Sequence, residues 1–186
     1  MELGVAIWEL RCGSVNDFAM LASVDWEDAR AGLFDADGKE QDWMHRPAVE
    51  FSVDSRKKKQ KPRADVIAFV PGALVLNEKA KVALGPFLSQ FGQLLELHCG
   101  GEILYFFNAT TLIDCIDVER SEKRPSGSIA MEAFDESNVP QEAAVFKDRR
   151  MVSVRIYVND AGRTEIERIV ADAGLTGVEC GTPQRF

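Results

Sequence analysis

The stretch from Val75 to Asn108 constrains the fold more than any other part of the chain, because its pattern predicts a helix followed by a two-stranded hairpin. Asn77 is a suitable N-cap, and apolar residues then recur every three or four positions as one stripe. We expect Gly85 and Pro86 to kink or break this helix, because proline lacks the amide hydrogen of a helical bond. We expect the next glycine, Gly92, to end the helix.

The hairpin is predicted from the adjacent glycines Gly100 and Gly101, which supply the positive φ angles of a tight turn. The return strand, Ile103 to Phe107, places apolar side chains on both of its faces. A strand that is apolar on both faces is buried within a sheet, so we expect this strand to be central.

Two signals in the last part of the chain complete the predicted fold. The stretch from Val152 to Val158 alternates strictly and predicts a strand. Thr164 and Glu167 form a capping box that predicts the start of the last helix, and Gly174 predicts its end. The sequence therefore predicts an α+β fold, with a mixed, mainly antiparallel β-sheet and two principal helices.

The chain is expected to pack as one domain with two parts, since 186 residues usually build a single core. Residues 1–62 are a β-rich part that ends in a basic loop, and residues 63–186 are an α+β core. In the first part, the apolar runs Gly4–Arg11 and Phe18–Asp25 are expected to pair as a hairpin. The alternation from Val49 to Val53 predicts a half-buried strand.

Composition limits the location and chemistry of the protein. No apolar run approaches the ~18 residues of a membrane helix, and the N-terminus lacks the basic segment and cleavage site of a secretory signal. We therefore expect a cytoplasmic protein without membrane association. The cysteines are far apart, which favours reduced, mostly buried thiols over a metal or redox site. They are Cys12, Cys99, Cys115 and Cys180.

Charge is distributed unevenly along the chain. The net charge is −8, yet the segment Arg56–Arg63 holds six of the 22 basic residues and no acidic one, so the remainder carries −8 − 6 = −14. Such a field repels nucleic acid and attracts basic partners. The basic segment lacks the aromatic residues or helix face of a nucleic-acid site, which favours a solvated loop over a phosphate-binding patch.

Asp114 and Asp117 are the candidates for catalysis, because two carboxylates three residues apart share a face of a helix or turn. Paired carboxylates serve as general acid and base or as metal ligands, but surface caps and salt bridges are the commoner role without a histidine or third carboxylate at suitable spacing. His45 and His98 have no such companions in the sequence. A metal-dependent or small-molecule-processing enzyme built on Asp114 and Asp117 is therefore the alternative function.

Short motifs follow one another in a fixed order from Asp65 onward. They are Asp65–Ile67, Leu76–Ala80, Gly92–Leu97, Leu104–Thr110, Ile113–Asp117, Ile156–Val158 and Ala173–Val178. In this order and spacing they resemble a bacterial family of immunity proteins from polymorphic toxin systems, formerly a domain of unknown function and named after a myxobacterial member. The N-terminal part matches that family only through Trp43 and Pro47.

The resemblance implies a protein that binds and neutralises a cognate antibacterial toxin by occlusion and that has no catalytic site or cofactor of its own. The acidic field suits a basic toxin, such as a nuclease that acts in the cytoplasm. A regulatory protein without a toxin partner is a further alternative. A homodimer that forms through an exposed sheet edge also remains open.

The poorly matched N-terminal part is where we expect the toxin to be recognised. Four carboxylates stand beside one aromatic residue there, and together they form the predicted contact patch. The patch consists of Asp35, Asp37, Glu40, Asp42 and Trp43. Its first aspartates resemble the start of a calcium loop but lack the remaining ligands, so a solvated turn is favoured. Trp43 is equally consistent with a core residue beside that turn.

Overall fold

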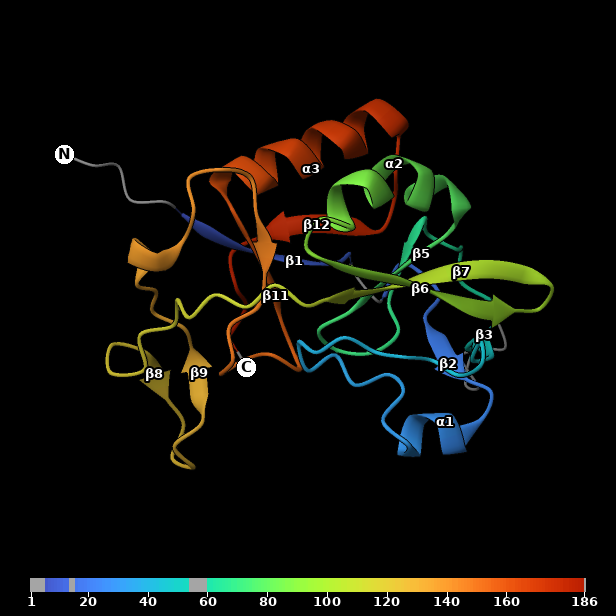
Figure 1. Cartoon of the computed structure of the whole chain (residues 1–186), viewed down its shortest axis with the longest axis horizontal. Coiled ribbons are helices and arrows are strands. Elements are labelled where there is room, and N and C mark those ends of the chain that lie inside the picture. The colour runs from blue at the N-terminus through green and yellow to red at the C-terminus, as the bar shows by residue number, and fades with distance from the viewer. Residues whose placement is uncertain (1–5, 14–15, 54–59, 186) are drawn as a thin grey trace.

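The structure is a computed structural model that describes residues 6–13, 16–53 and 60–185. Within these residues three α-helices and twelve strands form an α+β fold of four antiparallel sheets (Figure 1). The expected fold class is confirmed, with two principal helices, α2 (Glu78–Leu88) and α3 (Asp160–Ala173), and a short α1 (Trp26–Arg30). No helix in the described ranges has the length and apolar composition needed to span a bilayer.

One four-stranded sheet, named here the terminal sheet, joins the two ends of the chain. Its strands lie in the order β10 (Val145–Phe146), β11 (Ile156–Asn159), β1 (Ile7–Cys12) and β12 (Val178–Gly181). The expected hairpin between the first two apolar runs is wrong, because β1 pairs with β11 and β12 instead of β2. β1 lies in residues 1–62 and both of its partner strands lie in residues 63–186, so this sheet spans the predicted division.

The other four-stranded sheet, named here the hairpin sheet, is built from neighbouring segments. Its order is β4 (Val66–Ile67), β5 (Leu74–Leu76), β7 (Glu102–Ala109) and β6 (Gly92–Cys99). The tight turn between β6 and β7 is confirmed, with φ of 53° at Gly100 and 96° at Gly101. The expectation of a central strand is also confirmed, since β7 lies between β5 and β6.

Two smaller sheets lie against these. β2 (Leu21–Ser23) pairs with β3 (Val49–Phe51), and β3 is the predicted half-buried strand, with Val49 buried and Glu50 exposed. β8 (Glu122–Lys123) pairs with β9 (Ile129–Met131) and is followed by a 3₁₀ turn, Glu136–Asn138.

The main core lies between the two helices and both four-stranded sheets. Figure 1 shows α2 and α3 together on one side, and their buried residues Leu84 and Ile166 belong to one cluster with Phe107 of β7 and Val158 of β11. The opposite faces of the two sheets pack separately. Phe106 belongs to a cluster beneath the hairpin sheet, and Tyr157 belongs to one beneath the terminal sheet.

Helix α2 begins as predicted but ends differently. The Oδ1 atom of Asn77 accepts a helix amide at 2.9 Å, which confirms the N-cap. The helix is not broken at Pro86, which lies within its last turn. Gly92 does not end the helix but begins β6, where a Cβ atom would stand 2.2 Å from the carbonyl oxygen of Asn108. The glycine is required by close strand packing.

Helix α3 begins earlier than the capping box predicts. Asn159 is the N-cap, and its Oδ1 atom accepts the amide of Gly162 at 2.8 Å. Thr164 lies inside the helix, where its hydroxyl donates to the carbonyl of Asp160. The left-handed end at Gly174 is confirmed, with φ of 58°.

The predicted strand from Val152 to Val158 is wrong over its first half. A turn occupies that part, closed by the amides of Val154 and Arg155, which both donate to the carbonyl of Met151. Only β11 is extended, and all of its side chains are buried. Alternation of polar and apolar residues predicts a strand with one solvated face. Arg155 and Tyr157, which stand at the polar positions, are instead buried.

Buried charges lie beside the terminal sheet. The Arg155 side chain is nearly inaccessible and forms ion pairs with Glu9 and Glu132. The hydroxyl of Tyr157 donates to Glu132 at 3.0 Å. This part of the interior is stabilised by paired charges as well as by apolar contacts, since an unpaired buried charge is costly.

Candidate functional site

The predicted contact patch lies on residues 34–43, named here the acidic loop. Its backbone is held from below by Lys147, a fully buried side chain that follows β10. The Nζ atom of Lys147 donates to the carbonyl of Ala36 inside the loop and, at 2.8 Å, to the carbonyl of Val152. Burial lowers the pKa of Lys147 to about 8, and the charge of Asp37 opposes that shift. A buried amine thus ties the loop to the turn before β11.

The hairpin sheet provides a second set of anchors for the acidic loop. The buried amide of Asn108 donates to the carbonyl of Lys39 at 2.7 Å. Gln93 and Gln41 exchange two bonds: the amide of Gln41 donates to Oε1 of Gln93 at 2.8 Å, and Nε2 of Gln93 donates to the carbonyl of Gln41 at 3.1 Å. The loop is therefore fixed along its length by side chains that arise from regular strands.

The centre of the acidic loop is a close-packed turn. Gly38 has φ of 81°, and a Cβ atom there would stand 2.7 Å from Leu112 and 2.9 Å from Val152. Asp37 accepts the amide of Lys39 and forms an ion pair with its Nζ atom at 2.6 Å. The side-chain hydrogen bond from Lys39 is the main cause that holds the pKa of Asp37 below its usual value. The expected turn is present, but Gly38 is buried, so the turn is only partly solvated.

The remaining carboxylates of the patch face solvent. Asp35, Glu40 and Asp42 are exposed, and none of them forms a salt bridge with the residues that the structure describes. The structure therefore places three exposed carboxylates without a salt bridge to the described residues on a loop whose backbone is fixed. Charges that are held in place before a partner arrives lose little conformational freedom on binding.

Trp43 does not project into solvent as a contact residue would. Its ring is half-buried and packs at 5.6 Å from that of Phe106, and its Nε1 atom donates to the carbonyl of Leu33 at 3.0 Å. These contacts agree with the interpretation of Trp43 as a core residue and not with that of an exposed anchor. Its neighbour Met44 is the exposed one, with 91% of its surface accessible.

Sequence analysis did not select Met44 or Trp26, which is 62% exposed on α1. Both are near one side of the acidic loop, because Nε2 of His45 is 2.9 Å from Oδ1 of Asp28 and connects the Met44 segment to α1. The sequence carries no signal that separates these two exposed side chains from buried ones, because large apolar residues are usually buried.

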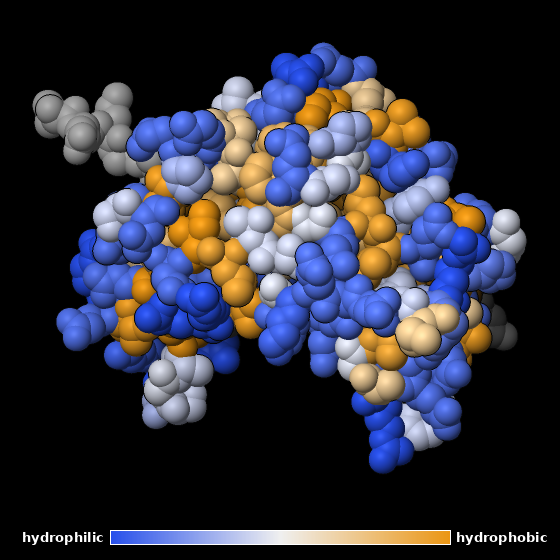
Figure 2. Space-filling view, viewed as in Figure 1, coloured by the Kyte–Doolittle hydropathy of each residue, from blue (hydrophilic) through white to orange (hydrophobic). Residues whose placement is uncertain are grey.

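The face shown in Figure 2 is not dominated by one apolar patch, because separate apolar areas lie there among hydrophilic side chains. A binding surface of this kind is specified by charge and by a few large side chains at its centre. The acidic loop together with Met44 and Trp26 has that composition, and we name this set the acidic face.

The candidate catalytic carboxylates have structural partners. Asp114 pairs with Arg149 at 2.6 Å. Asp117 pairs with Arg120 at 2.6 Å and accepts the amides of Glu119 and Arg120, and Arg120 is the main cause that lowers its pKa. Asp114 therefore forms a salt bridge, and Asp117 forms a salt bridge and caps a turn, which are the commoner roles expected from the sequence.

The cysteines and the basic segment can be placed in part. All four cysteines are free thiols; two are buried and two are partly buried, as expected. No group of three or more potential ligands for a metal ion occurs among the described residues. The first residues of the basic segment, 56–59, lie outside those ranges. Its last residue, Arg63, pairs with Glu102 at 2.8 Å and stacks on Phe51.

Comparison with known proteins does not add a family to this picture. No protein-family model matches the chain, and no match was found among curated proteins. The resemblance to immunity proteins therefore stays a prediction.

Proposed function

We propose that the protein is an immunity protein of the cytoplasm that binds a cognate, basic toxin through its acidic face and neutralises the toxin by covering it. The observation that carries the proposal is the fixed backbone beneath three exposed carboxylates of the acidic loop. In this proposal the protein contributes charge and shape and catalyses no reaction. A cytoplasm-acting nuclease is the toxin class that best fits the charge.

Charge supports the proposal through association kinetics. Carboxylates that are uncompensated attract a cationic partner before contact, which raises the association rate at low ionic strength. Met44 and Trp26 supply the apolar area that a purely electrostatic encounter lacks, because large exposed side chains become buried anchors in an interface. The contact between His45 and Asp28 supports this arrangement, because it brings the segment that carries Met44 next to α1, which carries Trp26.

The enzymatic alternative gains no support from the geometry. Asp114 and Asp117 each have a separate arginine partner, and Asp117 also accepts two backbone amides. A general acid or base needs a group free to exchange protons with a substrate. Homodimer formation stays a prediction from the sequence, which sedimentation equilibrium tests directly.

The first test is co-expression with the product of the neighbouring gene. The proposal expects protection of growth and a complex that survives purification. If that product is toxic and the chain neither binds it nor restores growth, the proposed function is wrong for this pair.

The second test asks whether the acidic face makes the contact. The triple variant Asp35→Asn, Glu40→Gln, Asp42→Asn removes its uncompensated charges, and we expect the association rate with the toxin to fall roughly tenfold at low salt. The measurement is surface plasmon resonance across a range of ionic strengths, where wild type should slow with added salt and the variant should respond less.

A matched control removes the same charge elsewhere. Glu119, Glu136 and Glu142 are exposed and form no salt bridge within the described residues, and they lie on the part of the chain around β8 and β9. Their replacement by glutamine should leave most of the rate unchanged. Equal slowing by both triple variants would show that net charge acts without a contact at the acidic face.

A further inference from the structure

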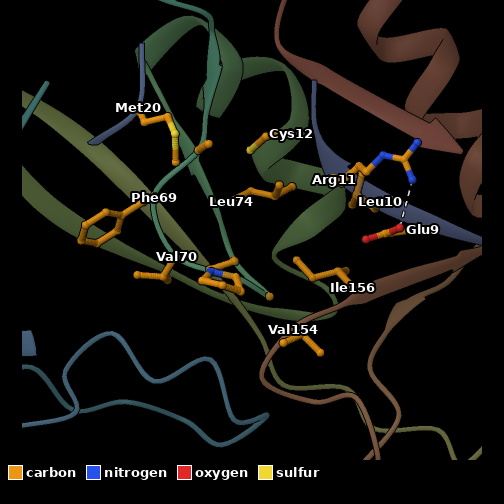
Figure 3. Close-up of a pocket in the computed structure, with 14 residues that line it drawn as sticks. Glu9, Leu10, Arg11, Cys12, Met20, Phe69, Val70, Leu74, Val154 and Ile156 are labelled. Carbon is orange, nitrogen blue, oxygen red and sulfur yellow. Dashed lines mark hydrogen bonds and ion pairs between the residues drawn. The ribbon is translucent and has the colours of Figure 1, made fainter. Parts of the chain in front are cut away.

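A pocket lies where the terminal sheet meets the hairpin sheet, and we name it the junction pocket (Figure 3). Its volume is about 230 Å³. Its walls come from β1, from residues 68–74 that lead into β5, and from the segment that leads into β11, with Met20 at one side. Three distant parts of the chain therefore build one cavity.

The walls of the junction pocket are mainly apolar. Figure 3 shows Phe69, Val70 and Leu74 on the hairpin-sheet side and Ile156 and Val154 on the other. Apolar walls favour a ligand that removes its own apolar surface from water.

The two sides of the pocket are held together at Gly72. This residue has φ of 71°, and a Cβ atom there would stand 2.9 Å from the backbone of Ser153. A larger residue would push the walls apart, so the glycine keeps the cavity in its present form.

Two charged residues line one end of this apolar space, Glu9 and Arg11, and they are paired with each other. Glu9 is only 8% exposed, and its Oε2 atom accepts hydrogen bonds from Arg11 at 2.9 Å and from Arg155. The Oε1 atom receives no hydrogen bond from the described residues, and Figure 3 shows this second oxygen turned away from Arg11 on the pocket side. The pocket thus presents one acceptor atom at the end of an apolar cavity.

The ion-pair network that holds Glu9 extends beyond the pocket. The ion pairs that link the described residues here join three carboxylates with two guanidinium groups, which leaves one negative charge in excess. The carboxylates are Glu9, Glu132 and Glu179, and the guanidinium groups are Arg11 and Arg155. A ligand that supplies a positive donor to Oε1 would complete the balance.

We propose that the junction pocket binds a small organic cation, an amine carried on a compact apolar body such as an arylalkylamine. The amine donates to Oε1 of Glu9, and the body fills the space between Leu74, Val70 and Ile156. The cavity is smaller than the roughly 300–1,000 Å³ of pockets for drug-sized ligands, which limits the ligand to about one ring. This site is separate from toxin binding and does not depend on it.

The test is a titration of the full ¹⁵N-labelled chain with phenethylamine, followed by ¹H–¹⁵N NMR. Saturable shifts are expected at the amides of residues 68–74 and of Ile156. The neutral analogue 2-phenylethanol should bind at least tenfold more weakly, and the anion phenylacetate should not bind. Equal binding of the amine and the alcohol, or no saturation at millimolar amine, would overturn the proposal.

Variants locate the ligand within the pocket. Ala68→Leu places a larger side chain in the lining and should abolish the shifts, whereas Val82→Leu, at an exposed position on α2, should not. Glu9→Gln should remove the preference for the amine over the alcohol. If Glu9→Gln does not fold, the comparison of amine, alcohol and anion on the wild type, together with Ala68→Leu, still tests the proposal. Binding that survives Ala68→Leu would contradict the assignment of the ligand to this pocket.

Discussion

The two four-stranded sheets share one helical layer but are built in opposite ways. The hairpin sheet joins segments that are close in sequence and buries aromatic and aliphatic side chains on both faces of β7. The terminal sheet joins the first strand to the last two and buries an ion-pair network beside them. The hairpin sheet thus combines pairing between strands close in sequence with apolar packing. The terminal sheet combines pairing between strands far apart in sequence with buried charges that need specific partners.

The largest expected effect tests the apolar sheet. Phe106→Ala removes a fully buried ring from β7 that contacts Phe34, Trp43 and Phe69. The free energy of unfolding should fall by about 4 kcal/mol, from lost apolar burial and the cavity left behind. Urea unfolding measures the change, which should not vary with salt. A loss below about 1 kcal/mol would show that the cluster can collapse around the missing ring.

The next effect tests the charged network of the terminal sheet. Glu132→Gln keeps the shape of the side chain but leaves the buried Arg155 with one carboxylate fewer. Breaking a buried ion pair should cost about 3 kcal/mol, because the remaining charge stays out of water. The control is Glu165→Gln on α3, which should lose far less stability because its pair with Arg168 is exposed and screened by solvent. Similar losses in both variants would remove the contrast between buried and exposed pairs.

Lys147 ties the acidic loop to the turn before β11 of the terminal sheet, and its burial predicts a dependence of stability on pH. Its pKa of about 8 lies below the ordinary value of 10.5, so between these values the unfolded chain holds a proton that the folded protein has lost. Stability rises with pH where the unfolded state binds more protons. Relative to Lys147→Met, the wild-type free energy of unfolding should rise by roughly 2 kcal/mol from pH 8 to pH 10. Chemical unfolding of both proteins across this range measures the difference, and parallel pH profiles would refute it.

The smallest effect compares two candidate caps of α3. Asn159→Ala removes the cap bond from the amide of Gly162 together with the buried bonds to Ala144, Pro140 and Glu142, and should cost about 2 kcal/mol. Thr164→Ala removes only a bond within the helix and should cost a few tenths of a kcal/mol. Thermal unfolding of the two variants distinguishes them. A larger loss for Thr164→Ala would restore the start of the helix that the capping box predicts.

Much of the hairpin sheet could be predicted from sequence because its signals are local. The Gly100 and Gly101 turn, the Asn77 cap and the apolar faces of β7 each depend on neighbours within a few residues. The terminal sheet could not be predicted in this way. Its order depends on pairing between β1 and strands at the other end of the chain, which no local pattern encodes.

The candidate site was predictable as a charge pattern but not as a structure. The carboxylates of the acidic loop were visible in sequence, whereas its anchors on Lys147, Asn108 and Gln93 come from segments far along the chain. A buried lysine has no sequence signature that separates it from a solvated one, because its partners are backbone carbonyls. The inward turn of Trp43 likewise depends on Phe106, which is distant in sequence.

The place of β1 between β11 and β12 also sets an order of events during synthesis. The ribosome releases β1 first. The backbone N–H and C=O groups on both edges of β1 stay without their strand partners until β11 and β12 have been synthesised. The β6–β7 hairpin is complete long before that moment. A nascent or truncated chain that lacks β12 would therefore carry an open strand edge able to capture another polypeptide, so premature termination should favour aggregation over a smaller folded product.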